Sequence, residues 1–179
     1  MSSHLEGDWE KLASILDPNR MKKKLNVTTK QLGFYAASVV KTGIRDGAPG
    51  GKAFIANSAL TVERKGSSSP LIDQGDLVGS ITYDDIDLNT VWVGVKKGSR
   101  SKKGNNLVDI AWVHEFGCTI RITSQRRKTL GSRGVNLKPN TRYIVIPERS
   151  FLRATLNDSA FREEVADRYI EALKELFLP

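Results

Sequence analysis

The stretch that decides the fold is NLVDIAWVHEFGCTIRI, residues 106–122. In its first half, Leu107, Ile110 and Ala111 recur at a spacing that places them on one face of a helix, and Asn106 is a suitable N-cap. Gly117 accepts the positive φ that closes many helices. After it, apolar and polar residues alternate over 118–122, which predicts a half-buried strand. The sequence therefore predicts a tight helix-to-strand corner at the centre of the protein.

The chain has 179 residues, which is the size of one domain, 1–179, with a substantial core. Its hydrophobic content of 39% and charged content of 27% are typical of a soluble globular protein. No apolar run reaches the roughly 20 residues that a membrane span needs. The first residues lack a basic region followed by an apolar one, so we expect no signal peptide, no membrane partner and synthesis in the cytoplasm.

Charge is distributed unevenly around a net +8. The segments 96–106 and 116–147 contain basic residues and no acidic ones. In the first, the basic residues are Lys96, Lys97, Arg100, Lys102 and Lys103; in the second, they are Arg121, Arg126, Arg127, Lys128, Arg133, Lys138 and Arg142. This asymmetry favours a polyanion or an acidic protein surface as a partner. Solvated flexible loops are an equally good interpretation.

Helices are expected in four places besides the central one. Residues 7–16 read as a short amphipathic helix, preceding a basic linker or first turn over 20–24. Thr28 and Gln31 form a capping box that begins a helix ending near Asp46-Gly47. A short helix over 57–63 is capped by Asn57 or Ser58. The last helix begins near Asp158 or Ser159, and its apolar face is expected to pack through Phe161, Val165, Tyr169, Ala172, Leu173 and Leu176.

The remaining segments predict strands and loops. Residues 65–70 have the composition of a flexible loop and lack the Gly-Lys-Ser/Thr ending of a phosphate-binding loop. Asp73 is expected to cap a short helical turn that brings Leu77 and Ile81 together. Strands over 80–87 and 90–96 form a hairpin, and a strand over 142–146 pairs with 118–122 across a mobile loop, 123–140.

Together these elements predict an α+β protein with a single mixed or antiparallel β-sheet, packed by helices and carrying long basic assembly loops. Phe151 and Leu152 are expected to dock against the core after Pro147 ends the last strand.

Catalytic and metal-binding patterns are weak. His114-Glu115 begins like a zincin motif, but position 118 is cysteine. Cys118 is the only cysteine, which excludes an internal disulfide; it is expected in the core, and His114 is expected to hydrogen-bond at the helix end. Three carboxylates near a strand end are candidate cation ligands but read better as an exposed strand end: Asp84, Asp85 and Asp87. We expect no enzyme activity, no metal and no cofactor.

Three separated stretches carry a resemblance: KGSSSPLIDQGDLVGSI at 65–81, VHEFG at 113–117 and IPERSFL at 146–152. They resemble the virion-morphogenesis, or tail-completion, family of tailed bacteriophages, whose members sit at the head–tail joint. Their order and spacing span most of residues 30–175. The family pattern favours proline before the phenylalanine of the last stretch, where this chain has Ser150. The matching structural positions are Asp73, Gly75, Leu77, His114, Glu115, Phe116, Gly117, Pro147, Arg149 and Phe151.

The resemblance implies a non-enzymatic structural subunit of the virion neck or the head-proximal end of the tail. It implies a ring of identical subunits, a hexamer, that contacts other neck and tail proteins. The basic loops would then line a channel and touch DNA, or dock onto acidic neighbours. For at least one loop we favour a protein partner, because few aromatic side chains lie among the cations.

Two other functions fit parts of the sequence. A non-specific DNA-binding protein would explain the net charge and the two basic segments. A nuclease that uses Asp84, Asp85 and Glu115 fits less well, because no nucleophile, base and oxyanion donor assemble in the pattern.

Overall fold

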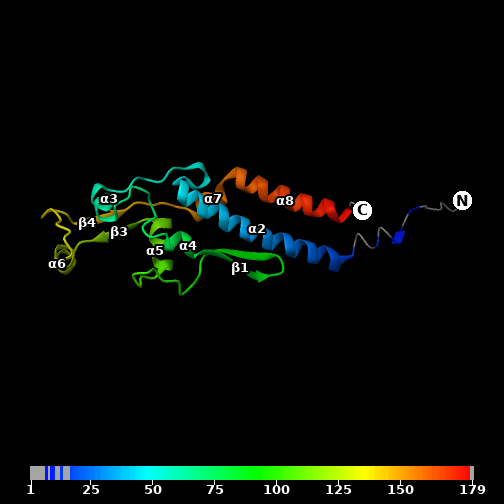
Figure 1. Ribbon diagram of the computed structural model, residues 1–179, viewed down its shortest axis with the longest axis horizontal. Helices are drawn as coiled ribbons and strands as arrows, with labels where there is room; N and C mark the ends of the chain where they lie inside the picture. The colour runs from blue at the N-terminus through cyan, green and yellow to red at the C-terminus, as the bar shows by residue number, and fades with distance from the viewer. Residues whose placement is uncertain (1–6, 8, 11–12, 14–16, 178–179) are drawn as a thin grey trace.

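The computed structural model describes residues 7, 9, 10, 13 and 17–177. The helix expected over 7–16 falls mostly outside this part of the chain. The described residues form an elongated α+β molecule (Figure 1), which confirms the expected fold class. The α2 helix runs along the middle of its longer half, and a smaller group of helices and strands forms the opposite end.

Helix α2 spans Pro18–Asp46, so the predicted start at Thr28 is wrong. The helix begins where the Asp17 carboxylate accepts a hydrogen bond from the Asn19 N–H at 3.0 Å, with Pro18 in the first turn. Both features favour a helix start. The basic segment 20–24 consists of Lys, Arg and Met residues with high helix propensity, and it belongs to the helix rather than to a linker.

The predicted cap, Thr28, is a mid-helix residue whose hydroxyl donates to the Lys24 carbonyl at 3.0 Å. Such a bond to the carbonyl four residues back is how threonine is satisfied inside a helix. The helix ends where predicted. Gly47 has φ 71° and its N–H donates to the Ile44 carbonyl at 3.2 Å.

Helix α8, Ser159–Phe177, packs antiparallel along one side of α2 (Figure 1). The Tyr35 ring stacks on Phe161 with centroids 5.8 Å apart, and the Thr29 and Tyr169 hydroxyls lie 2.7 Å apart. Residues later in α8 therefore contact residues earlier in α2, as expected of antiparallel helices. The predicted apolar face is confirmed, because its buried members are Phe161, Ala172 and Leu176.

The predicted hairpin is confirmed on the other side of α2 (Figure 1). Strand β1, Ile81–Asp87, pairs antiparallel with β2, Thr90–Val95. A Cβ added to Gly33 of α2 would lie 3.0 Å from the Tyr83 ring and 3.2 Å from a Val91 methyl. The missing side chain lets the hairpin approach the helix.

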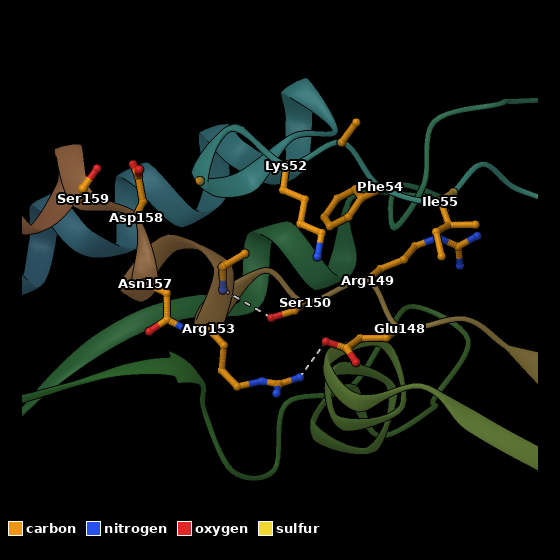
Figure 2. A pocket seen from close by; sticks show the side chains of 13 residues that line it. Lys52, Phe54, Ile55, Glu148, Arg149, Ser150, Arg153, Asn157, Asp158 and Ser159 are labelled. Carbon is orange, nitrogen blue, oxygen red and sulfur yellow. Dashed lines mark hydrogen bonds and ion pairs between the residues drawn. The ribbon is translucent and has the colours of Figure 1, made fainter.

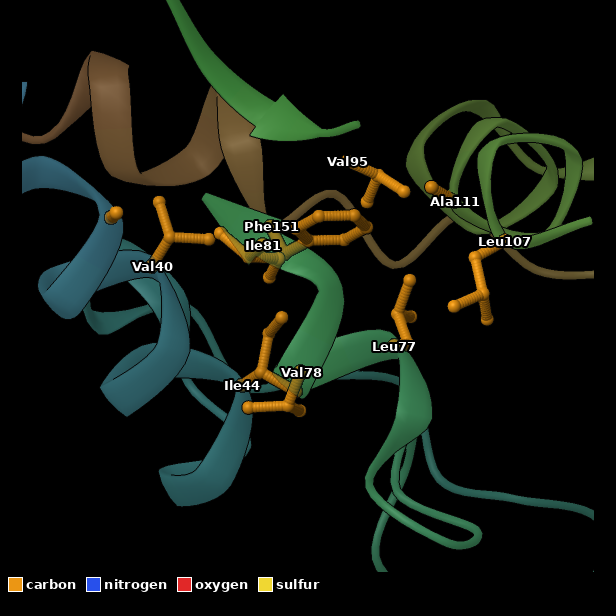
Figure 3. Close-up of a cluster of buried hydrophobic side chains, with 10 residues drawn as sticks. Val40, Ile44, Leu77, Val78, Ile81, Val95, Leu107, Ala111 and Phe151 are labelled. Atoms are coloured by element: carbon orange, nitrogen blue, oxygen red, sulfur yellow. The ribbon is translucent and has the colours of Figure 1, made fainter. Parts of the chain in front are cut away.

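The core lies where α2, the hairpin and two further helices meet (Figure 3). These helices are α4, Asp76–Ser80, and α5, Leu107–Phe116. Phe151 is 0% exposed within this cluster, as the sequence predicted. Burying a side chain of this size contributes about 2–3 kcal/mol. The other buried members are Ala37, Val40, Ile44, Leu77, Val78, Ile81, Val95, Leu107 and Ala111.

The strands form two separate sheets, so the expectation of a single sheet is wrong. Strand β3, Cys118–Arg121, pairs antiparallel with β4, Tyr143–Ile146, and both lie at the far end of the molecule (Figure 1). Each is four residues long, and α5 separates them from β2 in the chain. Strands β3 and β4 hydrogen-bond only with each other among the described strands.

Three short helices depart from or refine the expectations. Helix α3, Ala59–Lys65, is capped by Ser58, one of the two predicted caps. Helix α4 begins after Gly75 at φ 79°, not at Asp73. Helix α7, Leu152–Asn157, follows the docked Phe151 and precedes α8. A single 3₁₀ turn, η1, spans Pro49–Gly51.

Helix α6, Ser124–Ser132, occupies half of the segment that was expected to be a mobile loop. The Thr123 hydroxyl caps it by accepting a hydrogen bond from the Arg126 N–H at 3.3 Å. None of its residues is buried. The apolar periodicity that reveals most helices is absent here because α6 packs no apolar face against the core.

Candidate functional site

The stretches 113–117 and 146–152 meet at the buried side chain of Glu115. Glu115 lies in the last turn of α5 and is 4% exposed. Its two carboxylate oxygens accept hydrogen bonds from three consecutive backbone N–H groups at the start of α7. The distances are 2.9 Å from Phe151, 3.0 Å from Leu152 and 2.9 Å from Arg153. A carboxylate at this position satisfies donors that a helix N-terminus leaves unpaired.

Two side chains complete the Glu115 site. The Ser150 hydroxyl donates to Glu115 Oε1 at 2.7 Å, and Arg153 Nε approaches the same oxygen at 3.2 Å. Ser150, which stands where the family pattern has proline, therefore contributes a hydrogen bond that proline lacks. Burial by itself raises the pKa of Glu115, but the bonds from Ser150, Arg153, Phe151 and Leu152 outweigh burial and hold the pKa below its ordinary value.

Arg149 is the second buried charge of this joint, at 6% exposure. Its Nε donates to the Ile55 carbonyl at 2.7 Å and its Nη2 to the Ala56 carbonyl at 3.0 Å. Its backbone N–H donates to the His114 carbonyl at 2.7 Å. Burial lowers the pKa of Arg149. The residue thus ties the segment before α3 to the end of α5.

Gly117 allows the chain to turn from α5 into β3 against the end of β4. Its φ is 71°, and an added Cβ would lie 3.0 Å from Glu148 N and 3.2 Å from the Ile146 carbonyl oxygen. Both the positive φ and the close backbone require glycine here. The predicted helix-to-strand corner is confirmed. Cys118 after it is half-buried rather than in the core, because it belongs to the outlying β3–β4 sheet.

His114 was expected to make a hydrogen bond at the helix end. Its Nδ1 atom is buried and has no partner among the described residues. Burial, then the charges of Arg149 and Lys65, lower the pKa of His114 to about 4. The imidazole is therefore neutral at pH 7 and adds no positive charge to the helix end.

The stretch 65–81 lies beside this joint rather than inside it. Lys65 Nζ donates to the Ser69 carbonyl, and burial lowers the pKa of Lys65. The Asp73 carboxylate pairs with Lys103 at 3.1 Å, and Leu77 is buried in the core. Phe116 and Pro147 take less buried places, and Phe116 is half exposed.

An open pocket of about 680 Å³ lies between residues 50–55 and the segment 148–159 (Figure 2). Lys52 and Arg149 contribute cations to its wall, and Glu148 and Asp158 contribute carboxylates. Arg153 is already bonded to Glu115 and Glu148. Among the described residues that line this pocket, Arg153 and Glu148 are the two that form an ion pair with each other.

The candidate carboxylates of β1 do not converge. Asp85 pairs with Lys30 at 2.8 Å, whereas Asp84 lies 3.9 Å from Lys96. Asp87 accepts a hydrogen bond from the Asn89 N–H at 2.8 Å, within the hairpin turn. Over the residues that the structure describes, no group of three or more His, Cys, Asp or Glu side chains has the arrangement of a metal site.

The first basic segment is folded back on acidic residues. Besides the Lys103–Asp73 pair, the Lys102 N–H donates to Asp76 Oδ2 at 2.9 Å. Arg100 Nη1 donates to the Gly104 carbonyl at 3.0 Å within the same loop. Lys96 and Lys97 are exposed at its start. Within the described chain, Lys103 and Lys96 are the cations of this segment that pair with carboxylates, the latter at 3.9 Å from Asp84.

The second basic segment has a different environment. We name residues 118–146, which comprise β3, α6 and β4, the basic arm. Arg127 holds its return loop by donating to the carbonyls of Lys138 and Thr141 at 2.9 and 2.6 Å. Within the described chain, no cation of the basic arm pairs with a carboxylate. The side chains of Lys128, Arg133 and Lys138 are exposed.

Several large apolar side chains are exposed on β4 and α5, and the sequence did not predict their exposure. On β4, Tyr143 is 56% and Val145 is 67% exposed. On α5, Trp112 is 58% exposed and packs against Phe116 with centroids 5.6 Å apart. Arg153, also missed, stacks its guanidinium 4.5 Å from the Phe116 ring centroid. Exposed aromatic residues beside cations are typical of interaction surfaces.

No protein-family model, curated protein or solved structure matches this chain. Within the part of the chain that the structure describes, no helix combines the length and apolar character needed to cross a bilayer.

Proposed function

We propose that this chain is a structural subunit of the neck or the head-proximal tail end of a tailed bacteriophage, acting in tail completion or head–tail joining. It works without catalysis, as a ring of identical subunits, a hexamer, that contacts other neck and tail proteins of the virion. The proposal rests on the resemblance carried by residues 65–81, 113–117 and 146–152.

One structural observation supports it most. The buried Glu115 carboxylate of the stretch 113–117 accepts hydrogen bonds from Ser150, Phe151 and Leu152 of the stretch 146–152, which lie 35, 36 and 37 residues later in the chain. Their residue types are thus explained by a rigid joint rather than by a reaction. Exposed apolar side chains around the joint, Trp112 and Phe116, suit a subunit that binds other proteins.

Deleting the gene from the phage genome tests the function directly. We expect filled heads and separate tails, visible by electron microscopy, and restoration of joined particles when the gene is supplied in trans. Normal infectious particles from the deletion would overturn the proposal. The subunit number follows from the mass in solution and from class averages of the purified protein.

The basic arm favours non-specific DNA binding as a second candidate function. Its cations lack carboxylate partners in the described chain and are available to phosphates. Such binding weakens steeply with salt, because each phosphate contact releases a counterion. A gel-shift series from low to physiological salt decides the matter, and no shift at low salt would remove this candidate.

A further inference from the structure

The exposed face of the β3–β4 sheet combines cations with apolar groups. In the register of this sheet, Arg121 is opposite Tyr143 and Thr119 is opposite Val145. All four side chains are exposed. Residues opposite one another in a ladder project to the same side, so Arg121, Tyr143 and Val145 share one face. Nothing in the described chain covers this face.

Helix α8 presents the complementary chemistry on the side turned away from α2. Glu163 and Asp167 are four residues apart, and Ile170 follows three residues later, so the three lie on one stripe. Ile170 is 48% exposed, and Phe177, seven residues further on, is 49% exposed. Neither Glu163 nor Asp167 has an ion-pair partner among the described residues. The buried residues of α8 lie on its opposite side.

These two surfaces cannot meet within one chain. The basic arm lies at one end of the elongated molecule, whereas α8 runs toward the other end beside α2 (Figure 1). Any contact between the two surfaces therefore joins two copies of the chain.

We propose that the basic arm of one copy docks onto the outer stripe of α8 of a second copy. Arg121 pairs with Glu163 and Asp167, while Tyr143 and Val145 cover Ile170 and Phe177. This contact deepens the proposed function and rests on it, because it names the surfaces through which a ring would close. It joins two different patches, so it is head-to-tail and leaves a free arm and a free helix on every dimer.

The apolar half of the arm favours a protein partner over DNA. A phosphate backbone would neutralise the cations but leave Tyr143 and Val145 in water. The outer stripe of α8 offers two carboxylates, Glu163 and Asp167, beside apolar side chains, which match both halves of the arm; Lys174, further along the same stripe, is its exposed cation. Charge complementarity of this kind fixes the register of an interface and rejects wrong partners.

Two charge-reversed variants test the contact. The arm variant carries Arg121→Glu, and the helix variant carries Glu163→Lys and Asp167→Lys. All three side chains are exposed, and none makes a side-chain hydrogen bond or ion pair in the described structure. Lys22→Glu on α2 is the charge-matched control for the arm variant. Circular dichroism and the thermal midpoint confirm that each variant folds.

Sedimentation velocity measures the mass of each sample against the 19.8 kDa chain. We expect the wild type and the control to self-associate, and each reversed variant to associate at least about tenfold more weakly. An equimolar mixture of the arm and helix variants associates again, because an intact arm can pair with an intact helix and a reversed arm with a reversed helix. A variant that carries all three substitutions also associates again.

Several results would overturn this contact. They are a wild type that stays monomeric at every concentration, reversed variants that assemble like the wild type, or a mixture that does not associate. A duplex DNA oligonucleotide is a further probe. If only the arm variant fails to bind this DNA, and the helix variant self-associates like the wild type, the basic arm binds DNA and not α8. Reversed variants that assemble normally refute only the contact, whereas a phage without the gene that remains infectious refutes the function.

Discussion

Glu115 shows how one side chain can join elements that are distant in sequence. Its carboxylate takes the place of a capping side chain for α7, although it comes from α5, more than thirty residues earlier. A buried carboxylate is stable only when hydrogen bonds replace the lost water. Here three N–H groups, a hydroxyl and a guanidinium replace it.

Glu115→Gln tests this site at the level of one residue. The amide keeps the shape, but it removes the charge and places an NH₂ group near N–H donors. We expect a loss of about 2–4 kcal/mol in the free energy of unfolding, measured by urea denaturation. The control is Glu148→Gln, which removes a carboxylate that is exposed and bonded only to Arg153, with an expected change below about 1 kcal/mol. Equal effects of both changes would contradict this role of Glu115.

His114 predicts a dependence of stability on pH. Its pKa in the folded protein is about 4, below the ordinary 6.5, so the folded state favours the neutral ring. The free energy of unfolding is unaffected by this group above pH 6.5. It falls as the pH drops from 6.5 toward 4, because the unfolded chain takes up the proton first, with a slope of at most about 1.4 kcal/mol per pH unit. The pKa of Glu115 is held below 4.5, so its contribution is lost only at lower pH.

His114→Phe separates these two effects. Phenylalanine keeps a planar ring, removes the unpartnered Nδ1 and cannot titrate. We expect the variant to lose the stability slope between pH 6.5 and about 4.5 while it keeps the decline at lower pH. Urea denaturation at half-unit pH steps measures both. A wild type with constant stability over the upper window would contradict the assignment.

Individual elements depend on a few special backbone positions. The corner between α5 and β3 requires the positive φ of Gly117 and the close approach of Glu148. Helix α6, in contrast, depends on the Thr123 cap and on hydrogen bonds made by Arg127, because it buries no side chain. The corner is therefore a fixed joint, and α6 is an outlying helix of low intrinsic stability.

Gly117→Ala tests the corner. The added Cβ meets the backbone of residues 146 and 148 and strains a positive φ, so we expect a loss of about 2–3 kcal/mol in the free energy of unfolding. Gly79→Ala is the matched control, because Gly79 lies in α4 and an added Cβ meets nothing within 4 Å. We expect no loss of stability there, and up to about 1 kcal/mol of gain. Chemical denaturation compares the two variants.

At the scale of the whole molecule, the two ends differ in chemistry. The basic arm, with its unpaired cations, forms one end, whereas α8, whose outer stripe carries free carboxylates, runs along the other half beside α2 (Figure 1). A molecule with complementary ends associates head to tail, and such association closes into a ring when the rotation between copies allows it.

Association through these ends is expected to depend on salt. The paired charges are exposed before docking and are screened over about 8 Å at physiological ionic strength. We expect the self-association constant to fall as sodium chloride rises from about 0.05 to 0.5 M, measured by sedimentation. Apolar contacts alone would give association that is unchanged or stronger with salt. An association that strengthens with salt would therefore contradict the charge pairing.

Local chemistry determined much of this fold from the sequence alone. The Asn106 cap, Gly117, the alternation in the hairpins and the apolar face of the last helix each act within a few residues, and all were predicted. Helix α6 escaped prediction because a helix without a buried face has no apolar period. The start of α2 was misplaced because Thr28 and Gln31 imitate a cap where the backbone bonds were already satisfied.

Features that depend on contacts between distant parts of the chain were decided by the tertiary structure alone. Whether the strands form one sheet or two depends on which edges meet in space, and no residue near Cys118 encodes that. The sequence singled out Glu115 as a motif residue, but it did not show that its carboxylate would bind the N–H groups of Phe151, Leu152 and Arg153. The hydrogen bonds that keep a carboxylate buried come from a segment that only folding brings beside it, because proximity in space is not contained in any local pattern.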